Sequence, residues 1–107
     1  MEITPELSET EVFVLSAYRD YPMDPGDVTL LVDGVAMEVA GLADHWDTVL
    51  RDNIALTLRE LPVDRVVVAI ARPGAELRPG DHVLWAELRE ELLGEVDVVP
   101  LVALPAA

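Results

Sequence analysis

Residues 28–40 read VTLLV-DG-VAMEVA, and this stretch decides the fold. An apolar run rich in β-branched residues leads into Asp33-Gly34, and an alternating run returns from it. Asp-Gly readily supplies the positive φ angles of a two-residue turn, and between apolar runs it is the strongest short-range signal for a β-hairpin. The stretch therefore predicts two antiparallel strands, at residues 28–32 and 35–40.

Three more strands are predicted before and after this hairpin. Residues 12–15 (VFVL) are β-branched and aromatic, which predicts a strand within 11–19. Residues 65–71 read RVVVAIA, and such a continuous apolar run is typical of a strand buried on both faces in a parallel arrangement. The last strand is expected at 96–104, at a sheet edge, because Pro100 has no N–H to donate.

Two helices are expected between the later strands. Residues 43–61 carry apolar side chains at i, i+4 spacing, with Asp44 as the expected N-cap and Pro62 as the stop. The second helix is expected to begin near Asp81, its N-cap, and to end before Gly94. The apolar stripe of the first helix comprises Trp46, Leu50, Ile54, Leu58 and Leu61.

The order β-β-β-α-β-α-β predicts an α+β domain, with a mixed five-stranded sheet and two helices packed on one face. Residues 1–10 are expected to form a flexible acidic lead-in, and residues 11–107 a single globular domain. Helices on one face leave the other face open. Its apolar residues would need cover, most simply from another subunit.

This element order resembles the core of the ribonuclease H-like fold over about residues 11–104. The resemblance is one of topology and includes no specific motif. It implies acidic residues on the first strand, first helix and fourth strand that hold two divalent metal ions. Here Glu11 stands only at the entrance of the first strand, and residues 66–71 contain no acid. This departure argues against nuclease activity.

The charge of the chain limits its partners. The 107 residues include 21 Asp+Glu against 7 Lys+Arg, for a net charge of −14, and the basic residues are all arginine and scattered. Nucleic acid and anionic membranes attract clustered basic residues, so neither is an expected partner. A basic protein or a cation is electrostatically easier, and the alternative is that the charge serves solubility alone.

The chain contains no cysteine, which excludes disulfides, thiol catalysis and cysteine-bound metals. Its first residues are acidic and lack the apolar region of a signal peptide. No apolar run approaches 18 residues, so no membrane span is expected. The cytoplasm is the expected location.

The starts of the two helices form the first candidate site. Asp44, His45 and Asp47 begin the first helix, and Asp81 and His82 begin the second. If both helices follow parallel strands, these residues meet at one sheet edge, where they could bind zinc, manganese or iron. The alternative is that the aspartates are ordinary N-caps and the histidines lie on the surface.

Two further candidates involve arginines. Arg72 and Arg78, with the amides near Gly80, could bind an anion at a helix N-terminus, or the Arg-Pro-Gly repeats could simply form a rigid connection. Tyr18, Arg19 and Tyr21 suit a protein interface, although one tyrosine could instead pack on the core. Two strands could also join an interface by adding to a partner's sheet: the strand at 35–40, with Met37 and Val39, and the last strand with the apolar tail 104–107.

These features favour a small cytoplasmic, non-catalytic domain that acts by association. It is expected to form a homodimer or to dock on a protein partner, as an accessory or regulatory subunit without a cofactor. Two alternatives stay open. One is an acidic inhibitor or immunity-type protein that blocks a basic surface. The other is a small metal- or ligand-binding enzyme that uses the helix N-terminal edge.

Overall fold

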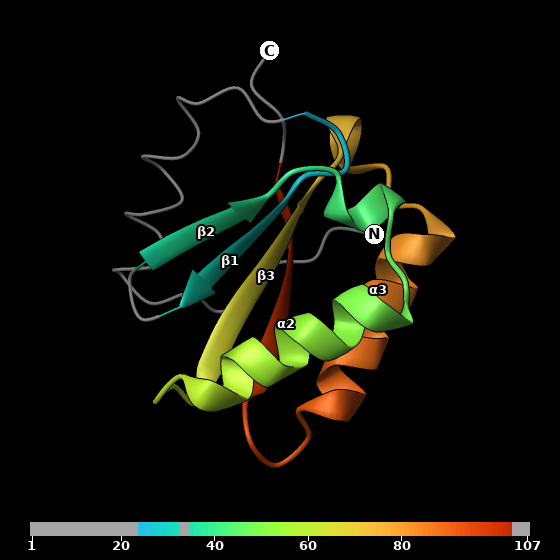
Figure 1. Cartoon of the computed structure of the whole chain (residues 1–107). Helices are drawn as coiled ribbons and strands as arrows, with labels where there is room; N and C mark the ends of the chain where they lie inside the picture. The colour runs from blue at the N-terminus through green and yellow to red at the C-terminus, as the bar shows by residue number, and fades with distance from the viewer. Residues whose placement is uncertain (1–23, 33–34, 104–107) are drawn as a thin grey trace.

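The structure is a computed structural model, and it describes residues 24–32 and 35–103 (Figure 1). The described chain forms one four-stranded sheet and two α-helices, with two short 3-10 helices between them. The strands are β1 (Val28–Val32), β2 (Val35–Val39), β3 (Arg65–Ala71) and β4 (Asp97–Ala103), and the helices are η1 (Leu42–Asp44), α2 (Thr48–Glu60), η2 (Pro73–Ala75) and α3 (Pro79–Glu91).

The predicted hairpin is confirmed as the β1–β2 pair. The two strands are antiparallel, with Val32 opposite Val35 and Val28 opposite Val39. Across the sheet the strand order is β2-β1-β3-β4, in which β1 is antiparallel to β3 and β3 is parallel to β4. The sheet is therefore mixed, as the sequence predicts.

The five-stranded sheet and the ribonuclease H-like topology are not confirmed. The described residues contain four strands, and β1 pairs directly with β3. The strand predicted at 11–19 and the lead-in predicted at 1–10 lie outside the described residues. What the structure shows is the coarser prediction, an α+β fold with a mixed sheet and two helices.

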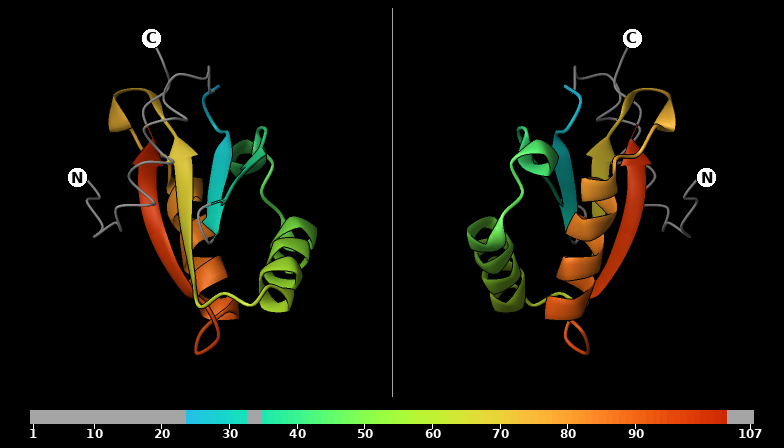
Figure 2. Two further views of the ribbon diagram at one scale, coloured as in Figure 1. Left: turned by 90° about the vertical axis from the view of Figure 1, so that its left-hand side faces the viewer. Right: turned by 90° about the vertical axis from the view of Figure 1, so that its right-hand side faces the viewer.

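Both helices cover the same face of the sheet, as predicted. Because β1 is antiparallel to both of its neighbours, β2, β3 and β4 all point the same way. The two connections through α2 and α3 also progress in one direction across the sheet, so crossovers of one hand place both helices on one side. In the right-hand view of Figure 2, α3 lies in front of the strands, and α2 lies to the left of them.

The main core fills the space between this sheet face and the helices. Alternate strand residues point into it, which follows from the two-residue period of a β-strand. From the strands it contains Val28, Leu30, Val32, Val66, Val68, Ile70 and Val98, and from the helices Ala55, Leu58, Leu84, Trp85 and Leu88. Aliphatic side chains dominate it, as expected from a chain with only 5% aromatic residues.

The opposite face of the sheet is also buried. Leu31, Val67 and Val99 form a second apolar cluster there, and each of them is at most 9% exposed within the single chain. In β3 every residue after Arg65 is buried, which confirms the prediction of burial on both faces. The expected open face, which would have needed a second subunit, is therefore not present at these residues.

Both helices begin at a different residue from the one predicted. The N-cap of α2 is Asp47, not Asp44, and its Oδ1 accepts the Leu50 N–H at 2.8 Å. The backbone of Asp47 is extended, as an N-cap requires, while Asp44 lies in η1. In α3 the N-cap is Arg78, and Asp81 lies one turn inside, where its Oδ2 accepts the Arg78 backbone N–H at 2.9 Å.

Replacing Asp47 with alanine is expected to lower the free energy of unfolding by about 1 kcal/mol, because the Leu50 N–H loses its acceptor. Asp47→Asn is the matched control, since asparagine caps a helix about as well as aspartate. Urea denaturation of both variants measures the effect. If the alanine variant were as stable as the asparagine variant, Asp47 would not be the cap.

Pro100 lies in β4, an edge strand of the described sheet, as predicted. The Asp97 N–H donates to the Asp64 carbonyl at 2.8 Å, so the odd-numbered residues of β4 direct their backbone groups toward β3. The nitrogen of Pro100 therefore points away from β3, and the missing N–H breaks no hydrogen bond of the sheet. Among the described helices, none is long and apolar enough to cross a membrane.

Candidate functional site

The candidate site lies at the end of the sheet where the parallel strands β2, β3 and β4 terminate. The N-termini of α2 and α3 lie at this same end, because each helix follows one of these strands. Ligands of open sheets commonly bind outside the carboxyl ends of the strands. Two clusters of charged side chains occupy this edge, one around Arg72 and one around Asp27.

Arg72 follows β3 and is only 1% exposed. Its Nε and Nη2 donate to the two carboxylate oxygens of Asp81 at 2.8 and 2.7 Å, in a bidentate pair. The Asp81 carboxylate is fully buried at the start of α3. A buried charge requires such a partner, so this pair joins the end of β3 to the first turn of α3.

Asp44 links this pair to the surface. Its Oδ1 accepts from Arg72 Nη2 at 3.0 Å and from Arg78 Nη1 at 3.2 Å. Hydrogen bonds to Asp81, and then to Asp44, raise the pKa of Arg72 above its ordinary value despite the opposing effect of burial. The two arginines predicted to bind an anion are thus brought together, and the carboxylate between them belongs to the chain itself.

The residues predicted to bind a metal serve other contacts. Asp44 and Asp81 meet through Arg72, whereas Asp47 caps α2. His82 packs edge-on against the Trp85 ring, with the ring centroids 6.0 Å apart. His45 is exposed and lies beside Gly41. Over residues 24–32 and 35–103, no group of three or more His, Asp or Glu residues could hold a metal ion.

The second cluster was missed by the sequence reasoning, and it consists of Asp24, Asp27 and Glu38. Asp27 is 6% exposed, and its carboxylate accepts the Gly41 N–H at 2.8 Å and the Asp24 N–H at 3.0 Å. It therefore fixes the chain segments before β1 and after β2. The hairpin register contained the signal, because Glu38 lies opposite Thr29 and hence diagonal to Asp27 on the same sheet face.

The carboxyl of Glu38 is close to these two aspartates. Partial desolvation, a hydrogen bond with Asp27 and the charges of Asp27 and Asp24 together raise the pKa of Glu38 above its ordinary value. Within residues 24–32 and 35–103, the side chains that contribute to this shift, Asp27 and Asp24, are both acidic. The end of β2 therefore carries a local excess of negative charge.

Of the residues predicted to form an interface, Tyr18, Arg19 and Tyr21 lie outside the described residues. Met37 and Val39 are described, and both are partly buried against the main core beneath the helices. Only part of each side chain can therefore contact a partner. The backbone of β2 can contact a partner more fully, because β2 lies at the edge of the described sheet.

The hydrogen bonds of β1 show which backbone groups of β2 face outward. The Ala71 N–H donates to the Asp27 carbonyl at 2.9 Å, so the odd-numbered residues of β1 bond to β3 and the even-numbered ones to β2. In the register of the hairpin, even residues of β1 pair with odd residues of β2. The N–H and C=O groups of Ala36 and Glu38 therefore point away from the described sheet.

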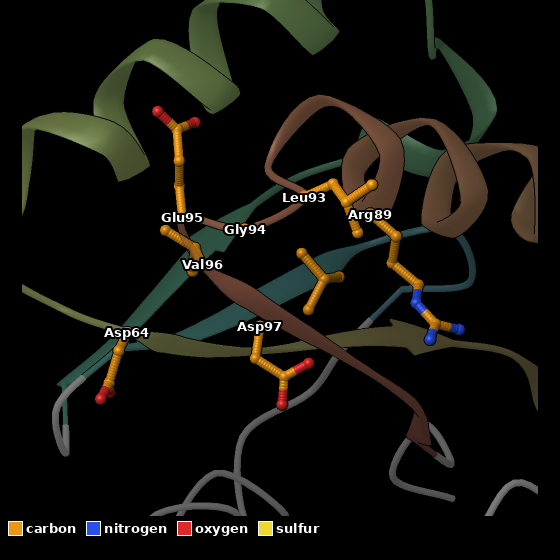
Figure 3. Close-up of a pocket in the computed structure, with 8 residues that line it drawn as sticks. Asp64, Arg89, Leu93, Gly94, Glu95, Val96 and Asp97 are labelled. Atoms are coloured by element: carbon orange, nitrogen blue, oxygen red, sulfur yellow. The ribbon is translucent and has the colours of Figure 1, made fainter.

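A hollow of about 330 Å³ lies at the opposite end of the molecule, between the end of α3 and the start of β4 (Figure 3). Its side chains diverge in Figure 3, and Glu95 is directed toward α2, where it binds Arg59 at 2.8 Å. Small-molecule sites are mostly apolar with a few converging polar groups. This hollow has neither property, although Leu93 on its rim is 82% exposed.

Comparison of the chain with protein-family models, with curated proteins and with solved structures finds no match. The geometry of the chain itself is therefore the basis for a functional proposal.

The Arg72–Asp81 pair predicts a dependence of stability on pH. Burial alone would raise the pKa of Asp81, but hydrogen bonds from Arg72 and Arg78 and the charges of both arginines lower it below its ordinary value. A carboxyl whose pKa is lowered by folding stabilises the protein above its unfolded pKa, and this contribution is lost as the pH falls through the folded pKa.

We therefore expect the stability advantage of the wild type over Asp81→Asn to be complete at pH 6 and to shrink steadily below about pH 4. Urea denaturation of both proteins at several pH values measures this difference directly, because other titrating groups are common to both. An advantage that stayed constant down to pH 2 would contradict the assignment.

Proposed function

We propose that this chain is a non-catalytic association domain that binds a protein partner by pairing a strand of that partner with β2. The observation that carries this proposal is the outward direction of the backbone groups of Ala36 and Glu38 at the edge of the described sheet. Strand addition to such an edge gains affinity from main-chain hydrogen bonds and specificity from alternate side chains.

The two edges of the described sheet differ in a way that supports this choice. In β4, Pro100 removes the central outward-facing N–H and hinders pairing with another strand. In β2 there is no proline, Glu38 is the only charged residue, and Val35 is 61% exposed. Proteins usually protect an edge strand with charge, proline or a bulge. The β2 edge has little of this protection and suits a partner strand.

The partner in this proposal is a second copy of the chain or another protein, for which the domain serves as an accessory or regulatory subunit. Nucleic acid and anionic membranes are not proposed partners, since the net charge of −14 would repel both. A chain without cysteine suits a reducing compartment, and the proposed location is the cytoplasm.

A second candidate function is an acidic inhibitor that covers a basic protein surface. Its support is that Arg51, Arg59, Arg72 and Arg78 all bind carboxylates within the chain, which offsets much of the positive charge. The surplus negative charge then faces outward. Such binding would weaken steeply with salt, whereas backbone pairing at β2 would persist.

Ala36→Pro tests the proposed function. It removes an outward-facing N–H and leaves the hydrogen bonds between β1 and β2 intact, so the protein is expected to fold and to lose its partner strand. Ala36→Thr is the matched control, because it keeps the N–H and suits a strand. Native mass spectrometry and analytical ultracentrifugation measure the assembly, and circular dichroism checks the fold. A folded Ala36→Pro protein that kept its partner would refute strand addition at β2.

A further inference from the structure

We infer that the strand received by β2 belongs to a different protein and presents a lysine or arginine beside Glu38, so that a second copy of this chain is not the preferred partner. This inference rests on the proposed function, since it assumes strand pairing at β2. It adds the chemistry of the partner, which follows from the acidic groups around Glu38.

The charge at this position is concentrated by the fold. Asp27 is buried, and both of its carboxylate oxygens accept backbone hydrogen bonds, so its carboxyl group is held in place at the end of the sheet that carries Glu38. Asp24 adds a third carboxyl to the same edge, and desolvation together with these neighbouring carboxyls raises the pKa of Glu38. A cation placed beside Glu38 would relieve this repulsion.

A second copy would increase the repulsion. If two β2 strands paired antiparallel about a two-fold axis at Met37, both outward-facing residues would be used, and each Glu38 would lie opposite Ala36 of the other copy. The two Glu38 side chains would then be diagonal neighbours on one sheet face. Six carboxyl groups, three from each copy, would gather between two molecules that each carry a net charge of −14.

A partner strand with a lysine or arginine beside Glu38 would be attracted to β2 rather than repelled. Cross-strand pairs of opposite charge are favourable, whereas like charges facing each other are not. The negative field of the whole chain would also attract a basic segment and speed its encounter with the edge. Hydrogen bonds between the two backbones would position the partner strand, and its basic side chain would distinguish it from strands without a positive charge.

Two synthetic peptides serve as probes, Thr-Val-Lys-Val-Lys-Val-Thr and Thr-Val-Glu-Val-Glu-Val-Thr, both with blocked ends. Each is titrated into ¹⁵N-labelled protein at about 20 mM salt, where screening is weak. The amide signals of Ala36 and Glu38 report binding at β2. We expect the lysine peptide to bind at least tenfold more tightly than the glutamate peptide. Glu38→Gln should reduce that preference several-fold, whereas Glu90→Gln, an equal charge change on α3, should leave it intact.

The outcomes separate this inference from the proposed function. If both peptides bind equally and Ala36→Pro abolishes both, strand addition stands and the basic partner is wrong. Ultracentrifugation at about 20 mM salt gives a second test. A wild-type dimer that is absent in Ala36→Pro would also support strand addition and contradict the basic partner. If the lysine peptide binds Ala36→Pro as tightly as the wild type, the peptide is attracted to acidic groups away from the β2 backbone. That result would refute strand addition itself. Absence of binding by either peptide at millimolar concentration would refute both.

Discussion

Arg72→Ala is expected to lower the free energy of unfolding by about 3–5 kcal/mol, because it leaves the Asp81 carboxylate buried without its cation. Arg72 and Asp81 are 1% and 0% exposed, so water cannot replace the lost hydrogen bonds without opening the edge of the sheet. The substitution also removes the Arg72 contact with Asp44 and so loosens η1. Urea denaturation at pH 7 measures the loss.

Two comparisons show whether burial of the charge causes this effect. Arg78→Ala removes an arginine whose side chain is 63% exposed and which binds the same Asp44, and it is expected to cost at most about 1 kcal/mol. The double variant Arg72→Met with Asp81→Leu removes both charges and should be more stable than Arg72→Ala, since replacing a whole buried pair is often neutral. A double variant as unstable as the single one would contradict this account.

Trp85→Ala is expected to destabilise the protein by about 3–5 kcal/mol, the usual range when a large aromatic residue in a core is truncated. Trp85 is buried in the main core, and its Nε1–H donates to the Val68 carbonyl at 2.9 Å. This contact ties the middle of α3 to β3, the central strand of the core. Thermal and urea denaturation both measure the loss.

Trp85→Phe is the matched control, because it keeps most of the apolar volume and removes the hydrogen bond. We expect it to cost about 1–2 kcal/mol, since the Val68 carbonyl loses its side-chain partner and a small void remains. If phenylalanine were as damaging as alanine, the hydrogen bond rather than the packing would dominate at this site.

The sequence predicts the hairpin and β3 well because their signals are local. Asp-Gly specifies a two-residue turn between β1 and β2, and the apolar run of β3 has no competing pattern. The start of α2 was predicted at the wrong residue because Asp44 and Asp47 are both suitable caps, three residues apart. In the structure Asp47 is the cap, and Asp44 instead binds Arg72, which comes from a distant part of the chain.

The candidate site was only partly predictable for the same reason. The sequence places the two helix starts, and with them Asp44 and Asp81, at one edge through the rule for parallel strands, and in the structure both of these carboxylates bind Arg72. It does not reveal that the carboxylates satisfy the arginines, since this depends on side-chain geometry. The Asp27–Glu38 contact required the hairpin register, which was available, together with the position of Asp27 beyond the strand, which was not.

The outward-facing positions of the two edge strands have a consequence at the level of the genetic code. Every alanine codon begins with GC and every proline codon with CC, so one base change separates the two residues. A single point mutation at Ala36 could therefore place a proline at an outward-facing position of β2, as Pro100 is placed in β4. A single mutation at Pro100 could replace that proline with alanine and restore the outward-facing N–H. Neither change touches the hydrogen bonds that hold the described sheet together. Gain or loss of a strand-pairing edge in this fold is thus one nucleotide away in either direction.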